Sequence, residues 1–295
     1  MAAPLDTDLT TVLGWAEPPA AADIEARIAA ANDAVAAKPA PADELARLVS
    51  CVDLTTLEGS DTPARVTALG QRAVRPDPAD PTLAPVAAVC VYPSLVPAAV
   101  AAVTGSTVEV ASVAGAFPSG QSPLPVRLAD IEAAVAAGAD EIDIVLNRGA
   151  FLAGDLATAH ADVVASVAAA HGRPVKVILE TGELGGTDAV TRAAMLAMAA
   201  GADFIKTSTG KIAVSATPES VVTMALAVAR FSAETGRTVG VKVAGGLRTV
   251  DDARLYAALV EAILGPDAVQ PARFRFGASR LLDALVEART AALAR

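Results

Sequence analysis

Six charged residues interrupt stretches of the sequence that are otherwise apolar and β-branched. Burying an unpaired charge is costly, so such residues are expected to be paired or to take part in chemistry. Lys206 is the most informative, because GADFIKTSTGK places it at the end of an apolar run and directly before a Thr-Ser-Thr-Gly turn. A lysine amine that gives up its proton can attack a carbonyl and form a Schiff base. The alternative is a lysine whose stem packs while its ammonium reaches solvent. The six residues are Asp53, Asp143, Lys176, Glu180, Lys206 and Lys242.

Lys242 and Asp143 favour the chemical interpretation of Lys206. Lys242 lies in VKVAGG, within the next apolar run. Adjacent parallel strands can bring two ammonium groups close together, and each then disfavours protonation of the other. Asp143, in ADEIDIVL, offers the carboxylate that would move protons on and off a carbinolamine. Lys176 and Glu180 could simply pair with neighbours, and we assign them a structural role.

Glycine-rich turns follow the last three apolar runs. Glycine lets the backbone approach an anion closely, and barrels often bind phosphate through backbone N–H groups after their last strands. The alternative for any one pair is an ordinary turn glycine. We expect a phosphate site built from Thr209, Gly210 and Lys211, from Gly245 and Gly246, and from Gly277 and Ser279. Arg280 follows Ser279, and its guanidinium either binds the phosphate or points outward and pairs with Asp283 of the last helix.

The elements that would position these residues alternate regularly along the chain. Short apolar runs are followed by stretches with helical periodicity, as in TPESVVTMALAVARFSAETG, which Thr217 and Pro218 open and Gly236 closes. Eight such strand–helix units predict an α/β protein, a (β/α)₈ TIM barrel. A doubly wound open sheet is the alternative, but no GxGxxG or GxxxxGK[ST] follows the first strand. The expected strands are 49–56, 86–92, 107–115, 139–146, 174–181, 202–209, 238–245 and 273–279.

The first part of the chain carries no recognisable chemistry. We divide the chain into an N-terminal helical extension, residues 1–44, and a barrel catalytic domain, residues 45–295. DIEARIAAANDAVAA predicts one amphipathic helix that ends near Lys38 and Pro39, and that caps the bottom of the barrel or serves a subunit contact.

Composition excludes several classes of function. The 295 residues are 53% hydrophobic and carry a net charge of −10, which argues against a nucleic-acid or anionic-membrane surface. Cys51 and Cys90 cannot form a disulfide framework, and two histidines make a zinc site or a Ser-His-Asp triad improbable. The acidic N-terminus and the lack of a long apolar run predict a soluble, cytoplasmic protein.

At these residues the sequence resembles the deoxyribose-phosphate aldolase family, class I aldolases that need no metal or other cofactor. The resemblance implies that Lys206 forms the Schiff base, Lys242 tunes it and Asp143 relays protons. It also places Asp53, Thr55 and Cys90 at the substrate. The motifs run in order from about Leu48 to Leu285: VDLTTLEGSDT, VCVYPS, ADEIDIVLNRGAFLAGD, VKVILETGEL, GADFIKTSTGKIAVSATPES, VGVKVAGGLRT and RFGAS.

The resemblance implies reversible cleavage of 2-deoxy-D-ribose 5-phosphate into D-glyceraldehyde 3-phosphate and acetaldehyde, in the breakdown of deoxynucleosides. A small phosphorylated sugar is then the partner, and a homodimer is compatible with the family. Arg280 departs from the family pattern, in which a serine follows GAS, and the terminal tyrosine of some members is missing. Two other hypotheses are a Schiff-base barrel lyase for a different phosphorylated carbonyl and a catalytically silent sugar-phosphate-binding barrel.

Overall fold

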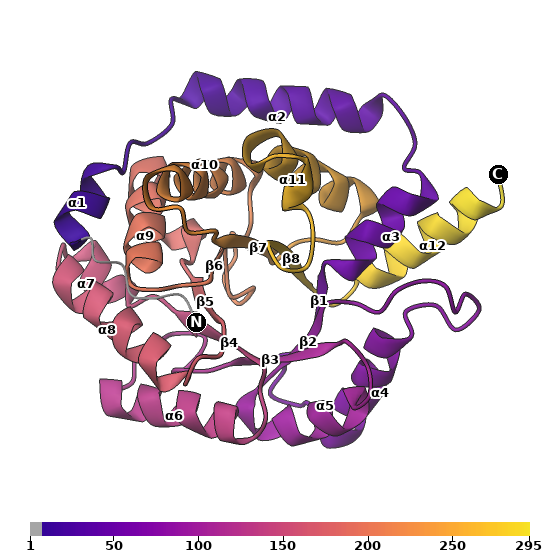
Figure 1. The fold of residues 1–295 in the computed structure, drawn as a ribbon, viewed down its shortest axis with the longest axis horizontal. Coiled ribbons are helices and arrows are strands. Elements are labelled where there is room, and N and C mark those ends of the chain that lie inside the picture. Colours follow the sequence, from indigo (N-terminus) through magenta and orange to yellow (C-terminus); the bar gives the residue numbers. More distant parts are fainter. Residues whose placement is uncertain (1–7) are drawn as a thin grey trace.

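The computed structural model describes residues 8–295, and its eight strands close into a single barrel (Figure 1). Each strand pairs in parallel with the next one along the chain, and β8 pairs back with β1. The predicted (β/α)₈ architecture is confirmed, and the open sheet is excluded because the barrel leaves no free edge. The strands are β1 (Val52–Thr55), β2 (Ala88–Val91), β3 (Glu109–Val113), β4 (Glu141–Val145), β5 (Val175–Ile178), β6 (Phe204–Lys206), β7 (Gly240–Ala244) and β8 (Phe274–Ala278).

Helices surround the barrel on the outside (Figure 1). The longest, α10, begins as predicted: Thr217 and Ser220 form a capping box, Pro218 occupies the first turn, and Gly236 ends the helix at a φ of 71°. Within residues 8–295, no helix combines the length and the apolar character that crossing a membrane requires. The helices after β1 are α4 (Pro63–Val74), α5 (Val96–Val103), α6 (Leu124–Ala136), α7 (Arg148–Leu152), α8 (Leu156–Ala169), α9 (Thr187–Ala199), α10 (Pro218–Thr235), α11 (Val250–Leu264) and α12 (Leu281–Leu293), with 3₁₀ turns at Pro93–Leu95, Thr181–Glu183 and Pro266–Ala268.

The N-terminal segment forms three helices, α1 (Leu9–Gly14), α2 (Ala21–Ala36) and α3 (Ala42–Ser50). The helix expected to end near Lys38 is α2. It lies across the outer side of α10 and α11 rather than beneath the barrel, because Ile24 and Ala31 pack into the same apolar core as the barrel helices (Figure 1). Arg254 of α11 fastens this arrangement by donating to Val35 O at 2.9 Å and to Glu44 at 2.8 Å. Helix α3 crosses the boundary expected at residue 44 and continues to Ser50, so β1 begins three residues later than predicted.

The interior of the barrel has an apolar side and a charged side. Ala88, Cys90, Ala111 and Val113 of β2 and β3 form a small apolar cluster with Leu57. The other strands contribute buried charged side chains, namely Asp53, Glu141, Asp143, Lys176, Lys206, Lys242 and Arg275. Since such charges survive burial only with partners, the polar chemistry of the molecule is concentrated on this side.

Candidate active site

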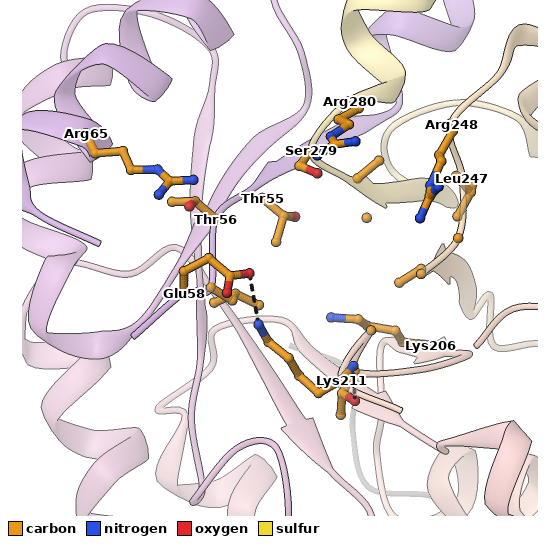
Figure 2. Close-up of a pocket in the computed structure, with 18 residues that line it drawn as sticks. Thr55, Thr56, Glu58, Arg65, Lys206, Lys211, Leu247, Arg248, Ser279 and Arg280 are labelled. Carbon is orange, nitrogen blue, oxygen red and sulfur yellow. Dashed lines mark hydrogen bonds and ion pairs between the residues drawn. The ribbon is translucent and has the colours of Figure 1, made fainter. Parts of the chain in front are cut away.

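Lys206 is the last residue of β6, and it lines a cavity of about 640 Å³ (Figure 2). The cavity lies at the carboxyl ends of the strands, where the active sites of TIM barrels form. Its walls come from the last residues of β1, β7 and β8 and from the segments that follow β1, β6, β7 and β8. The lining residues besides Lys206 are Thr55, Thr56, Leu57, Glu58, Arg65, Thr209, Gly210, Lys211, Ala244, Gly245, Gly246, Leu247, Arg248, Gly277, Ala278, Ser279 and Arg280.

Lys242 and Asp143 lie beside Lys206, as the sequence predicts. The register of β6 and β7 places Lys206 directly opposite Lys242. Both amines donate to the same oxygen, Asp143 Oδ2, at 2.8 Å each, so the two nitrogens are no further apart than twice that distance. Neither Lys242 nor Asp143 lines the cavity, and both side chains are fully buried. Lys206 is therefore the amine of this group that a ligand can reach.

Beneath the cavity, six buried charges form a closed ring of alternating sign. Asp143 contacts Lys242, Lys242 contacts Asp53 at 2.5 Å, and Asp53 contacts Arg275 at 2.7 Å. Arg275 then contacts Glu141 at 2.9 Å, Glu141 contacts Lys176, and Lys176 returns to Asp143 at 3.2 Å. We call these six residues the charge ring. They comprise three acids and three bases, so the charge ring is neutral by itself. Lys206 adds a seventh charge. It pairs with Asp143, whose carboxylate also pairs with two members of the charge ring.

The charge ring holds its members in their ionised forms. Burial alone would raise the pKa of Asp143, but Lys176, Lys206 and Lys242 outweigh it and keep that pKa well below its usual range. Burial alone would lower the pKa of Lys242, but Asp143 and Asp53 raise it above the ordinary value. Lys242 is consequently a fixed cation, and Asp143 is an ionised carboxylate.

Glycines line the side of the cavity formed by the ends of β7 and β8, and two of them are tightly packed against neighbouring residues. Gly245 has a φ of 87°, and a Cβ there would lie 2.4 Å from the Ser215 Cβ. A Cβ on Gly277 would lie 2.9 Å from the Ala244 Cβ. Any larger residue at Gly245 or Gly277 would therefore collide with neighbouring protein atoms. Thr209, Gly210, Gly246 and Ser279 also line the cavity, as predicted from the sequence.

Four cationic side chains surround the mouth of the cavity (Figure 2). Lys211 and Arg280 were expected there. The alternative for Arg280 was a pair with Asp283, but Asp283 pairs with Arg72 at 3.0 Å, and Arg280 lines the cavity just before α12. The other two, Arg65 and Arg248, were not predicted from the sequence, and neither was the acidic Glu58. Arg248 could have been found from its position two residues after the glycine pair, whereas Arg65 reaches the cavity from the first turn of α4.

Glu180 has the structural role assigned to it. It is buried at a φ of 58° and accepts hydrogen bonds from Thr209 N at 2.9 Å and Thr209 Oγ1 at 2.6 Å. The carboxylate thus fixes the turn that follows Lys206. Lys176, the other residue assigned a structural role, is a member of the charge ring.

The family resemblance assigns three further residues to the substrate site, and they lie at different depths below the cavity surface. Thr55 lines the cavity and donates from Oγ1 to Asp53 O at 2.8 Å. Asp53 lies in the charge ring and does not line the cavity, because Lys242 and Arg275 bind its carboxylate. Cys90 is buried in the apolar cluster, where burial raises the pKa of its thiol even though Lys242 lies nearby. Neither Asp53 nor Cys90 touches the cavity surface.

Comparisons with known proteins agree with this geometry. The family model described as DeoC/LacD family aldolase matches residues 47–285. A deoxyribose-phosphate aldolase of Agrobacterium fabrum is 43% identical over 246 residues, covering 82% of this chain and 90% of its own. The human deoxyribose-phosphate aldolase is 42% identical over 249 residues, covering 81% and 78%. The structure of a tetrameric deoxyribose phosphate aldolase from Aeropyrum pernix has a TM-score of 0.66 at 26% identity, covering 91% of this chain and 98% of its own. The chain belongs to the DeoC/LacD family of aldolases.

Proposed function

We propose that this chain reversibly cleaves 2-deoxy-D-ribose 5-phosphate into D-glyceraldehyde 3-phosphate and acetaldehyde through a Schiff base on Lys206. One observation carries the proposal. Lys206 is the amine that extends from the neutral charge ring into a cavity that glycines and cationic side chains also line.

The reaction begins with attack of the Lys206 amine on C1 of the open-chain sugar. The carbinolamine loses its hydroxyl as water and becomes an iminium. Loss of the proton from the C3 hydroxyl then breaks the C2–C3 bond, whose electron pair moves into an enamine. Glyceraldehyde 3-phosphate leaves, the enamine takes a proton at C2, and water releases acetaldehyde from Lys206. The iminium is the electron sink of this sequence.

Asp143 is placed to move the protons of the first steps. Its Oδ2 lies 2.8 Å from Lys206 Nζ. Conversion of the Lys206 ammonium into a neutral carbinolamine removes one of the three cations that hold Asp143 ionised, so its affinity for a proton rises at the step where a proton must be carried. Lys242 is not a competing nucleophile, because a protonated amine between two carboxylates has no free electron pair.

The substrate phosphate is proposed to bind at the β7–β8 wall. Backbone N–H groups of the glycine turns can donate to its oxygens, and the nearby cations supply charge-assisted hydrogen bonds. The residues proposed for this role are Gly210, Lys211, Gly245, Gly246, Arg248, Gly277, Ser279 and Arg280.

Borohydride trapping tests the proposal. The protein is incubated with deoxyribose 5-phosphate and borohydride, digested, and analysed by mass spectrometry. We expect a substrate-dependent adduct on the peptide that carries Lys206, and no adduct and no turnover in Lys206→Ala. An adduct on Lys242, or trapping that persists in Lys206→Ala, would refute the assignment. Acetaldehyde, acetone and dihydroxyacetone as donors separate this reaction from that of another Schiff-base lyase, and trapping without turnover would identify a silent barrel.

Three broader expectations accompany this proposal. We propose residues 45–295 as the catalytic unit, a homodimer as its assembly and the cytoplasm as its compartment. Light scattering of the purified chain measures the assembly, and fractionation of the source cells measures the compartment.

A further inference from the structure

We propose that Glu58 limits the preference of this site for phosphorylated over plain sugars, because it competes with the substrate phosphate for Lys211. The inference rests on the proposed function, since it takes Lys211 as a phosphate ligand. Glu58 Oε1 accepts a hydrogen bond from Lys211 Nζ at 3.0 Å, and the Lys211 side chain extends toward Glu58 (Figure 2). We refer to this contact as the Glu58–Lys211 pair.

The Glu58–Lys211 pair spans the mouth of the cavity. Glu58 follows β1, and Lys211 follows β6. Two strands, β7 and β8, lie between β1 and β6 around the barrel, so the pair joins loops that are not neighbours. The glycine turns proposed to hold the phosphate follow these two intervening strands.

Both ends of the pair are fixed by hydrogen bonds within their own loops. On the β1 side, the carboxylate of Asp61, whose side chain is 1% exposed, accepts from Glu58 N at 2.9 Å and from Thr56 Oγ1 at 2.9 Å. On the β6 side, Lys211 N donates to Thr209 Oγ1 at 3.1 Å, and Thr209 is itself bound by Glu180. The contact therefore follows from the positions of two anchored loops.

Charge makes Glu58 distinctive among the residues that line the cavity. It is the one acid among them, whereas Arg65, Lys206, Lys211, Arg248 and Arg280 are bases. Its carboxylate binds the Lys211 ammonium, which a substrate phosphate would otherwise bind. A phosphorylated substrate must displace this carboxylate and then tolerate its negative charge, while a plain sugar meets neither cost.

The test is Glu58→Gln, which keeps the shape of the side chain and removes its charge. Because an exposed ion pair is worth little, we expect the KM for deoxyribose 5-phosphate to fall roughly fivefold at low salt, with kcat/KM for deoxyribose unchanged. Inorganic phosphate, titrated calorimetrically into the protein, should bind more tightly by a similar factor, and the gain should shrink as salt is added. Glu234→Gln is the matched control, since Glu234 forms a 3.0 Å exposed pair with Arg230 at the far end of α10.

An unchanged or increased KM for deoxyribose 5-phosphate in Glu58→Gln would overturn the inference, the increase showing that Glu58 positions Lys211 for the phosphate. The phosphate titration distinguishes failure of this inference from failure of the proposed function. A wild-type protein that neither turns over nor traps deoxyribose 5-phosphate refutes the function, whereas phosphate affinity equal in wild type and Glu58→Gln refutes the role of Glu58.

Discussion

Asp143→Asn should separate the chemistry of the site from its stability. The substitution keeps the shape of the side chain but removes the carboxylate that three lysines share. General acid–base catalysis by one side chain contributes roughly 10²–10⁴-fold. Asp143 is fully buried, so water cannot readily replace it, and we expect kcat to fall by about 10³-fold. Because Lys206 remains, borohydride trapping with deoxyribose 5-phosphate should persist, although more slowly.

Loss of one partner from a buried ion pair costs about 3–5 kcal/mol, so Asp143→Asn should also lower the free energy of unfolding. Glu141→Gln is the matched control, because Glu141 lies two residues earlier in β4 and pairs with Lys176 and Arg275 rather than with Lys206. It should lose a similar amount of stability in urea melts, yet retain kcat within a few-fold. A kcat for Asp143→Asn within tenfold of wild type, or an equal loss of kcat in Glu141→Gln, would refute the proton-transfer role.

Two further predictions concern Arg280 at the cavity and Glu109 at the start of β3. Arg280→Ser should lower the ratio of kcat/KM for deoxyribose 5-phosphate to that for deoxyribose by roughly tenfold or more, because a charge-assisted contact is worth about 1.5–3 kcal/mol; an unchanged ratio would show that Arg280 does not bind the phosphate. Burial and the carboxylate of Glu141 raise the pKa of Glu109 to about 7. The folded protein then holds a proton that the unfolded chain has released, from the ordinary pKa of a glutamate up to about 7, so stability falls as the pH rises through this window. Glu109→Gln should lose less stability than wild type between pH 5 and pH 8 in thermal melts, and equal losses would contradict the prediction.

The sequence predicted the barrel because each strand is a short apolar run, which is typical of parallel strands buried on both faces. It also placed Lys206, Lys242 and Asp143 together, because charges inside such runs must meet within the barrel. The start of β1 was predicted too early, because Val49 and Ser50 are the last residues of α3 and Cys51 is its C-cap. Apolar composition alone does not separate a helix end from the strand that follows it.

The residues at the mouth of the cavity that were not predicted from the sequence lie outside the strands. Glu58 and Arg65 belong to a loop and a helix start, where charged residues are common and usually solvated. Only the fold of the Asp61 turn brings them to the cavity. Arg275 was not predicted as a buried charge. It lies between Phe274 and Phe276, next to the glycine segment that was assigned to phosphate binding. Its partners come from β1 and β4, and no local pattern reveals them.

The charge ring also constrains how this sequence can vary. Each of its six members has two neighbours of opposite sign, so a substitution that neutralises one position leaves an uncompensated charge in the barrel interior. Tolerated changes should therefore occur as acid–base pairs, such as Asp53→Asn together with Arg275→Met, whose combined effect on stability is smaller than the sum of the two. Libraries that randomise these positions one at a time would recover mostly destabilised variants, whereas libraries that vary opposite charges jointly would recover stable barrels with new interior residues.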